Sequence, residues 1–263
     1  MATEDLEKKL RLREKRYEVE QLMREKRSEE LESLEEVFDK STLMLLYKIL
    51  NQGYLSQIHG CIKAGKESRV YWGKDSEDRD VAVKIYLKAS SEFRKGRRIY
   101  LEGDPRFQRP KRGTRSLVYL WAQKEFRNLQ AAHSARVSVP KPILVRGNIL
   151  LMQFIGEEGV PAPLLKDLRR VPVALYERLL RNIRLLYQKA GLVHGDLSEY
   201  NVMVWKRRPV VIDMSQTVAV DHPLSDVFLK RDLANLNNYF LKHSVETRPV
   251  DNLETWVKSE NAD

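Results

Sequence analysis

Two aspartates and an asparagine are the side chains in this sequence whose types and spacing are best suited to chemistry. Asp196 and Asn201 lie five positions apart in a polar stretch between apolar segments, and Asp213 ends the apolar run Val210-Val211-Ile212. In a rigid loop Asp196 can orient a hydroxyl group and accept its proton. The oxygens of Asn201 and Asp213 are hard ligands, which favour Mg²⁺ or Mn²⁺ over zinc. The pattern predicts phosphoryl transfer with a bound metal ion.

A lysine and a glutamate upstream supply the charges that such a reaction needs. Lys84 lies in the alternating segment Val81 to Ile85, on the same face as the small residue Ala82, which leaves room for a flat ring. Glu125 falls on the apolar face of a helix predicted over residues 117–132, where a carboxylate is costly unless it is paired. We expect an ion pair that lets Lys84 hold the α- and β-phosphates of a nucleotide.

Each of these residues also has an ordinary explanation. Lys84 can extend from a half-exposed strand into water, and Glu125 can pair with any nearby arginine. Asp and Asn side chains often cap turns. The occurrence of all five residues in this order in one chain nevertheless favours the catalytic interpretation.

A turn between the first two predicted strands is the candidate phosphate cover. It contains a single glycine, Gly65, so it is a weak signal by itself. Backbone amides near Gly65 and the hydroxyl of Ser68 are expected to cover phosphates. Lys66 either assists them or is simply exposed, and Val70 is expected to pack on the adenine ring.

The elements that must position these residues follow from hydrophobic periodicity. A β-rich first half precedes a helical second half, which predicts an α+β fold of two lobes with a cleft between them. We expect a charged helical extension in residues 1–41, an N-terminal lobe in 42–155 and a C-terminal lobe in 156–263. The expected elements are a helix at 43–50 capped by Ser41 or Thr42, three strands from Ser56, a basic aperiodic loop at 88–115, helices at 117–132, 173–189 and 225–243, and short strands between them.

Composition narrows the class of protein further. The 263-residue chain has a single cysteine, Cys61, which excludes an internal disulfide and a cysteine-rich zinc site. No apolar run approaches the length of a membrane span, so we expect a cytoplasmic protein without membrane contact. The net charge of +10 favours acidic partners such as nucleotides or RNA.

Several sequence segments resemble those of one family. "GKESRVY", "APLLKDL", "LVHGDLSEYN", "VIDMSQ" and "DHPLSDVFLKRDLANLNNYF" closely resemble the RIO family of atypical serine/threonine protein kinases, in particular its first, archaeal-type subfamily without a winged-helix domain. The likeness covers roughly residues 42 to 250. It implies a two-lobed protein-kinase-like fold, ATP with Mg²⁺ or Mn²⁺, phosphorylation of a protein substrate or of the chain itself, and a role in small ribosomal subunit maturation near the pre-ribosomal particle.

The resemblance also implies site residues and departures from ordinary kinases. Met152 to Ile155 resembles the hinge, with the Gln153 carbonyl and the Ile155 amide on the adenine edge. The family suggests a phospho-aspartate intermediate at Asp213. Gly195 replaces the arginine of the H-R-D motif, and about fifty residues follow Asp213, which predicts a truncated helical C-terminal lobe without the usual peptide-docking platform.

Two other functions remain open at this point. Aminoglycoside and choline kinases also carry an H-G-D-x-x-x-x-N loop, so a small-molecule phosphotransferase is the nearest alternative. The second is a nucleotide-gated, ribosome-binding scaffold, suggested by the basic segment 88–115. That segment either contacts RNA phosphates or closes over the ATP site.

Overall fold

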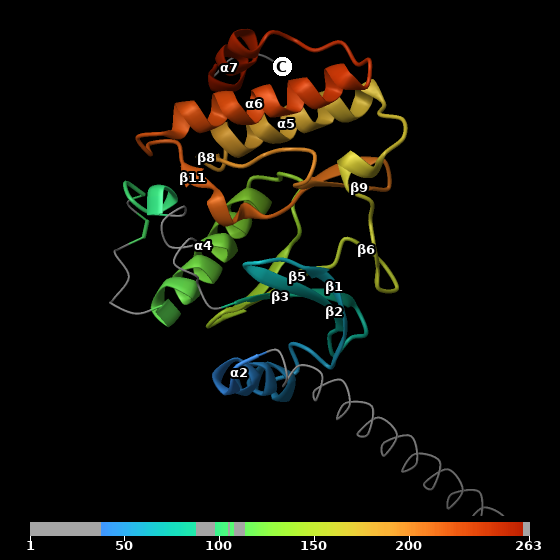
Figure 1. Cartoon of the computed structure of the whole chain (residues 1–263), viewed down its shortest axis with the longest axis vertical. Coiled ribbons are helices and arrows are strands. Elements are labelled where there is room, and N and C mark those ends of the chain that lie inside the picture. Colours follow the sequence, from blue (N-terminus) through green and yellow to red (C-terminus); the bar gives the residue numbers. More distant parts are fainter. Residues whose placement is uncertain (1–37, 88–97, 105, 108–113, 260–263) are drawn as a thin grey trace, which may run out of the picture.

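The structure is a computed structural model that describes residues 38–87, 98–104, 106–107 and 114–259. The charged helix predicted for the first forty residues lies almost entirely outside this part of the chain. An antiparallel sheet occupies the middle of the molecule, with one helix below it and a helical half above it (Figure 1). No described helix is both long and apolar enough to span a bilayer.

The central sheet has five strands in the order β1-β2-β3-β5-β4, every neighbouring pair antiparallel. Each strand was predicted, and the two-residue alternation of each gives the sheet two distinct faces. The bounds are Gln57–Ala64 for β1, Ser68–Lys74 for β2, Asp80–Tyr86 for β3, Pro142–Arg146 for β4 and Ile149–Gln153 for β5.

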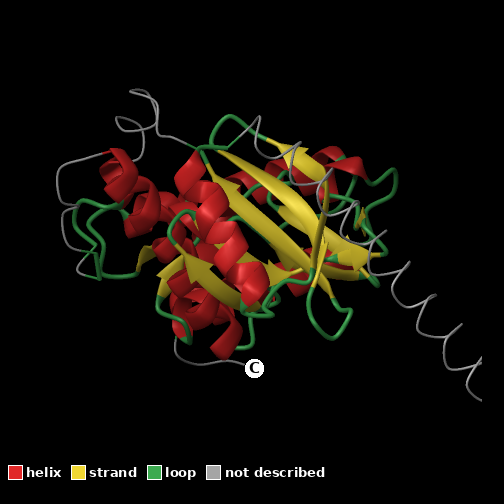
Figure 2. Cartoon of the chain, turned by 90° about the horizontal axis from the view of Figure 1, so that it is seen from below, coloured by secondary structure: helices red, strands yellow, loops and turns green. Residues whose placement is uncertain are grey.

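One face of this sheet is covered by helix α2 (Lys40–Asn51). Leu46 and Ile49 of the helix pack in one buried cluster with strand residues such as Val83 and Ile85. Figure 2 views the sheet from the α2 side. The predicted cap of this helix was wrong: the Asp39 carboxylate, not Ser41 or Thr42, accepts the hydrogen bond from the Thr42 amide, at 2.9 Å.

The opposite face of the sheet carries Ala82, Lys84 and Tyr86 toward helix α4 (Thr114–Ser134). This helix starts three residues earlier and ends two later than predicted. Its buried stripe matches the predicted three- and four-residue spacing. The stripe consists of Val118, Trp121, Ala122, Glu125 and Leu129.

The helical half contains α5 (Val173–Gln188), α6 (Ser225–Lys242) and α7 (Val250–Lys258). The prediction ended the helices at residue 243 and missed α7, which buries Leu253 and Val257 against α5 and α6. Leu253 and Val257 are four positions apart and lie on one face of the helix, so this spacing was the periodic pattern that could have predicted it. Short strand pairs and 3₁₀ turns complete this half: β6 (Gly156–Glu157) with β7 (Val160–Pro161), β8 (Leu192–Val193) with β11 (Val218–Ala219), β9 (Val202–Trp205) with β10 (Arg208–Val211), η2 (Leu165–Asp167) and η3 (Met214–Gln216).

One large buried cluster connects the two halves. It extends from Tyr86 and the α4 stripe to apolar residues of α5, α6 and α7. The α+β, kinase-like arrangement of a β-rich half and a helical half is therefore as predicted, while the boundaries at residues 41 and 155 stay predictions.

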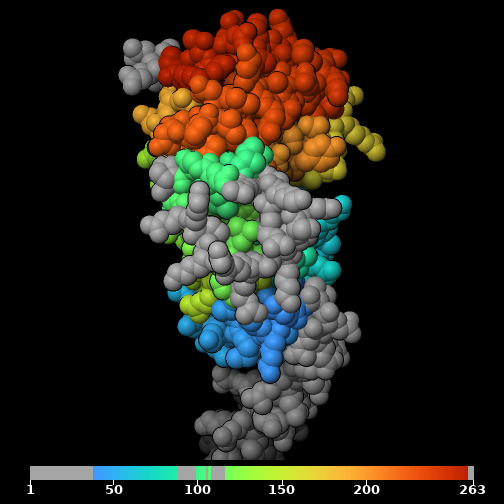
Figure 3. All heavy atoms as spheres, turned by 60° about the vertical axis from the view of Figure 1, so that its left-hand side comes forward, coloured from blue at the N-terminus to red at the C-terminus, as the bar shows by residue number. Residues whose placement is uncertain are grey.

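Part of the predicted basic loop is attached to the helical half. A 3₁₀ turn, η1 (Arg98–Tyr100), places the Tyr100 ring on Phe228 of α6, with 5.1 Å between centroids. The His222 Nε2 lies 3.1 Å from the Ile99 carbonyl and 2.9 Å from the Glu102 carbonyl. Figure 3 shows this segment directly against α6. The prediction of an aperiodic loop here did not anticipate this attachment.

Candidate active site

Three of the predicted residues meet at the ammonium group of Lys84. Its Nζ atom lies 2.8 Å from Glu125 Oε1 and 3.0 Å from Asp213 Oδ1. The side chains of Lys84 and Glu125 are almost fully buried, whereas 38% of the Asp213 side chain is exposed. Strand β3, helix α4 and the segment after β10 therefore converge on one point, although they are far apart in the sequence.

Burial and pairing compete at this point. Burial alone would lower the pKa of Lys84, but the carboxylates of Asp213 and Glu125 outweigh it and raise that pKa, so the ammonium stays charged. Burial raises the pKa of Glu125, and the neighbouring Lys84 charge opposes that rise. The pair is consistent with a lysine kept charged and in place to bind phosphate oxygens.

The loop that carries Asp196 is held by a carboxylate on α6. Asp232 accepts hydrogen bonds from the amides of Gly195, at 2.8 Å, and Leu197, at 2.9 Å. Gly195 has φ of +78°, and a Cβ atom there would lie 2.9 Å from the Gln216 carbonyl oxygen. The tight approach of these two loop segments explains why glycine stands at this position.

A buried histidine supports the same loop from inside. The His194 Nε2 lies 3.2 Å from the Ile212 carbonyl, and its Nδ1 accepts a hydrogen bond from the Asp196 amide at 3.3 Å. These contacts require a neutral ring with its proton on Nε2. Burial lowers the pKa of His194 to about 4, which keeps the ring neutral.

The segment after Asp213 is fixed by the helix that carries Glu125. The Asn128 amide donates to the Met214 carbonyl at 2.9 Å, and the buried Lys124 ammonium donates to the Thr217 carbonyl. Asp213 itself has φ of +61°, a strained conformation for a residue with a side chain. Helix α4 thus positions both the partner of Lys84 and the chain around Asp213.

The predicted metal ligands Asn201 and Asp213 could form a metal site that is completed by substrate. The Asn201 amide nitrogen donates to the Asp196 carbonyl at 2.8 Å, which fixes the amide plane. The amide oxygen is then the atom of this side chain that can ligate a metal ion. In the described part of the chain no three His, Cys, Asp or Glu residues form a metal-holding group. Two protein oxygens with phosphates and water as further ligands suit Mg²⁺, which rarely has an all-protein site.

Two of the predicted nucleotide-contacting residues, Val70 and Ala82, lie on the same sheet face as Lys84. Val70 pairs with Lys84 across β2 and β3, and Ala82 pairs with Met152 of β5. The predicted hinge follows directly: Gln153 ends β5, and the carbonyl of Ile155 accepts a hydrogen bond from the Ala162 amide at 2.9 Å. This face provides an apolar floor beside the charged centre.

In the turn from β1 to β2, part of the predicted phosphate cover is already engaged. The Gly65 amide donates to the Ser68 carbonyl at 2.9 Å, so this amide closes the turn. Lys66 is exposed, and Ser68 is half-buried at the start of β2. The role of this turn therefore depends on its other amides and on the Ser68 hydroxyl.

Comparisons with known proteins identify the family of the chain. The family model described as "RIO domain" matches residues 69–253. The chain belongs to the RIO domain family. The RIO-type serine/threonine-protein kinase Rio1 of Methanocaldococcus jannaschii is 39% identical over 240 residues, which cover 90% of this chain and 82% of that protein. The human serine/threonine-protein kinase RIO1 is 39% identical over 86% of this chain, but the match spans only 40% of the human protein.

These matches confirm the predicted family, and the relatives' names bear out the predicted class of enzyme. They do not favour the small-molecule phosphotransferase. Among solved structures, the Rio2 kinase–ADP/Mg²⁺–phosphoaspartate complex from Chaetomium thermophilum has a TM-score of 0.64 and 24% identity, covering 83% of this chain and 67% of that one. At that identity the likeness shows the fold alone, and it confirms the predicted fold class.

The sequence analysis missed several residues that position the backbone of the candidate site. Asp232 lies on the buried face of α6 with Leu229, Leu233 and Leu236, so it is a carboxylate on an apolar stripe, as Glu125 is. The rule that identified Glu125 would have found it. Lys124 and Asn128 gave no comparable signal, because their partners are backbone carbonyls of a distant segment.

Proposed function

We propose that the chain is an ATP-dependent serine/threonine protein kinase of atypical type that phosphorylates a protein substrate and itself. The observation that carries the proposal is the contact of Lys84 with both Glu125 and Asp213, which unites a phosphate-binding lysine with a metal-binding aspartate. Positioning and electrostatic stabilisation are the main requirements of phosphoryl transfer, and this arrangement provides both.

Each residue has a distinct role in the proposal. Lys84, held by Glu125, binds the α- and β-phosphates, and Asp196 orients the substrate hydroxyl and accepts its proton. Gln216 donates to Asp196 Oδ2 at 2.9 Å and so fixes the direction of that carboxylate. Asn201 and Asp213 would hold Mg²⁺, for which Mn²⁺ substitutes, and the ion supplies neutralisation of charge on the phosphates.

The nucleotide base would lie against the sheet face beside Lys84. Val70 and Ala82 support this placement because they share that face in the strand register. We further propose that the Gln153 carbonyl and the Ile155 amide bind the adenine edge. The turn with Gly65, Lys66 and Ser68 would cover the phosphates.

A phospho-aspartate step is a part of the proposal that can be tested separately. An oxygen of Asp213 would attack the γ-phosphorus, the bond to ADP would break, and water would later hydrolyse the acyl phosphate, which makes the chain an ATPase switch. A related Rio2 kinase was solved as a complex with phosphoaspartate. Trapped label on this chain that is sensitive to hydroxylamine supports the step, and label confined to serine or threonine contradicts it.

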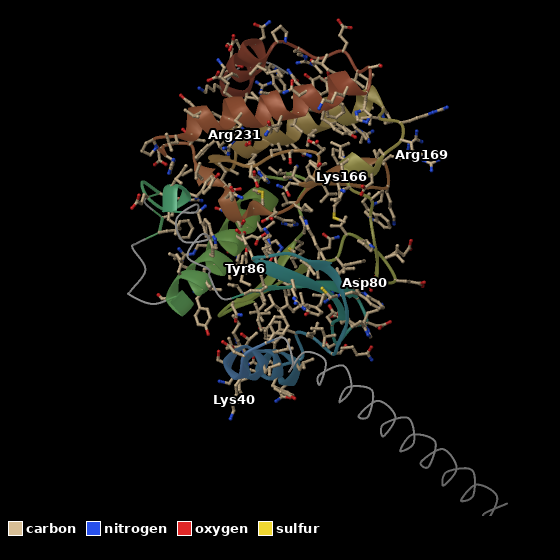
Figure 4. All side chains as sticks on the ribbon, in the orientation of Figure 1. Lys40, Asp80, Tyr86, Lys166, Arg169 and Arg231 are labelled. Carbon is tan, nitrogen blue, oxygen red and sulfur yellow. The ribbon has the colours of Figure 1, made fainter. Side chains whose placement is uncertain are left out.

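The proposed context is small ribosomal subunit maturation in the cytoplasm. Its support is charge: the chain carries +10, and Arg178 of α5 donates to the Arg207 carbonyl at 2.7 Å, which joins a helix and a turn that are both basic. Arg169, labelled in Figure 4, lies just before α5. Basic exposed residues of this region are Arg169, Arg170, Arg178, Arg181, Lys206, Arg207 and Arg208.

These residues keep the scaffold alternative open, because a basic surface binds RNA whether or not the chain transfers phosphate. The predicted loop 88–115 lies partly outside the described residues and cannot carry the argument alone. Binding of RNA through phosphates should weaken steeply with salt, and replacing Lys206 and Arg207 by glutamate should flatten that dependence. A catalytically inactive variant that still supports ribosome assembly would favour the scaffold.

The catalytic proposal is tested with γ-labelled ATP and Mg²⁺ or Mn²⁺. Wild type and Asp196→Ala are compared for self-labelling, labelling of an added protein and release of phosphate. We expect transfer or release by wild type and its loss in the variant, and the ratio of the products separates kinase from ATPase use. ATP binding by wild type without either product would contradict the catalytic proposal.

A further inference from the structure

Tyr86 contacts both residues of the Lys84–Glu125 pair, and the sequence analysis did not identify it. Its hydroxyl donates a hydrogen bond to Glu125 Oε2, and its ring lies 5.2 Å from the Lys84 ammonium. Only 2% of Tyr86 and none of Glu125 is exposed. Figure 4 labels Tyr86, which lies where the sheet faces α4.

The buried carboxylate of Glu125 needs more than one donor. A carboxylate has about four acceptor sites, and an unpaired buried charge is strongly unfavourable. Lys84 has three N–H donors, which it divides between Glu125 and Asp213. In the proposed complex Lys84 must also donate to phosphate oxygens, so fewer of its N–H donors remain for Glu125.

We propose that Tyr86 is a positioning residue whose hydroxyl holds Glu125 charged and in place while Lys84 turns to the nucleotide phosphates. The inference rests on the proposed function of this site. Tyr86 is suited to the role because its donor is neutral, so it supports the carboxylate without competing for the phosphates.

Local packing fixes the ring independently of its hydroxyl. The Tyr86 amide donates to the Asn148 carbonyl at 2.9 Å, and the Asn148 side chain donates to the Tyr86 carbonyl at 2.8 Å. Burial, followed by the charges of Glu125 and Asp213, raises the pKa of Tyr86, so the phenol stays protonated and remains a donor. A phenylalanine would fill the same space in the apolar cluster and remove only the donor.

Tyr86→Phe is therefore the test, and Tyr176→Phe is its matched control. The Tyr176 hydroxyl is also buried and donates to Asn237 Oδ1 at 2.8 Å, but it lies between α5 and α6, away from Lys84. ATP turnover, its KM for ATP and the melting temperature are measured for both variants. We expect kcat to fall about 10-fold in Tyr86→Phe, with KM changed less than about 2-fold, because a hydrogen bond to a charged group is lost.

The control variant Tyr176→Phe should have a lower melting temperature than wild type but the same kcat. Wild-type kcat in Tyr86→Phe, or an equal loss of kcat in both variants, would overturn the inference while leaving the proposed function intact. A wild type without turnover would overturn the proposed function and this inference with it.

A double-variant cycle guards against a fold defect. In Glu125→Gln the neutral amide removes the need for a strong donor, so adding Tyr86→Phe should change kcat less than about 2-fold. A loss of about 10-fold in kcat when Tyr86→Phe is added to Glu125→Gln would show that Tyr86 does not act through Glu125, and it would overturn the inference whether or not Tyr86→Phe alone folds.

Discussion

Two groups of residues in the candidate site are held in contrasting ways. The buried centre, formed by Lys84, Tyr86 and Glu125, is almost closed to solvent and is held by contacts between its own side chains. The loop centre, formed by Asp196, Asn201 and Asp213, lies on irregular segments, and the Asp213 side chain is 38% exposed.

The loop centre owes its shape to support from outside the reacting groups. Asp232, His194 and Asn128 bind the backbone on which the loop residues sit. Asp196 can therefore be altered without opening the core, whereas the loss of Lys84 leaves the buried Glu125 charge without its cation. The contrast predicts that activity and stability separate in the loop centre and fall together in the buried centre.

The largest expected effect on activity is in the loop centre. Asp196→Ala should lower phosphate transfer by roughly 10²–10⁴-fold, the usual contribution of a catalytic base. Its free energy of unfolding should change by less than about 1 kcal/mol, because the residue is only partly buried. Labelled ATP and urea unfolding check both parts, and a large loss of stability would break the comparison.

Changes in the buried centre should lower both activity and stability. Lys84→Met leaves Glu125 fully buried without its cation, so we expect a loss of about 3–5 kcal/mol in the free energy of unfolding together with loss of turnover. Adding Glu125→Gln removes the uncompensated charge and should restore part of the stability but no activity. Chemical denaturation of the single and double variants tests this, and equal stability of the two would contradict it.

His194 and Asp232, the two titrating groups that support the loop of Asp196, should have opposite effects on stability as pH changes. Burial lowers the pKa of His194 from 6.5 to about 4, so the unfolded chain binds more protons between these values and stability falls as pH falls. Burial raises the pKa of Asp232 from 3.8 to about 7, so the folded chain binds more protons in that range and stability rises as pH falls.

Each of these effects amounts to about 2 kcal/mol between pH 7 and pH 5, so they largely cancel in wild type. Relative to wild type, His194→Gln should become more stable on acidification and Asp232→Asn less stable. Urea unfolding at both pH values checks the signs. Variants that keep the wild-type pH dependence would show that these groups do not titrate as described.

The smallest expected difference is between two glycine variants. Gly195→Ala introduces both a positive φ and a contact of 2.9 Å with the Gln216 carbonyl, whereas Gly191→Ala, at φ of +64°, meets nothing within 4 Å. Both should lose about 1 kcal/mol from backbone strain, and Gly195→Ala about 1–2 kcal/mol more. Only Gly195→Ala should also lower turnover. Equal melting temperatures of the two variants would contradict the close approach of Gly195 to the Gln216 carbonyl.

Sequence patterns identified the charged residues that lie in apolar surroundings. Glu125 on an apolar stripe and Lys84 in an apolar strand were found this way, and the structure joins them. Tyr86 was not found, because tyrosine is ordinary in a strand and only the fold shows its hydroxyl against Glu125. The choice of Asp39 as the helix cap depended on local backbone geometry. The need for glycine at position 195 depended on the carbonyl of Gln216, twenty-one residues away in the sequence.

The most direct test of the central claim measures ATP binding and ATP turnover on the same samples of wild type, Asp196→Ala and Lys84→Met. The account predicts that Asp196→Ala binds ATP within a few-fold of wild type but transfers almost no phosphate, and that Lys84→Met loses both. Undiminished transfer by Asp196→Ala would contradict the claim that these two centres form one phosphotransferase site.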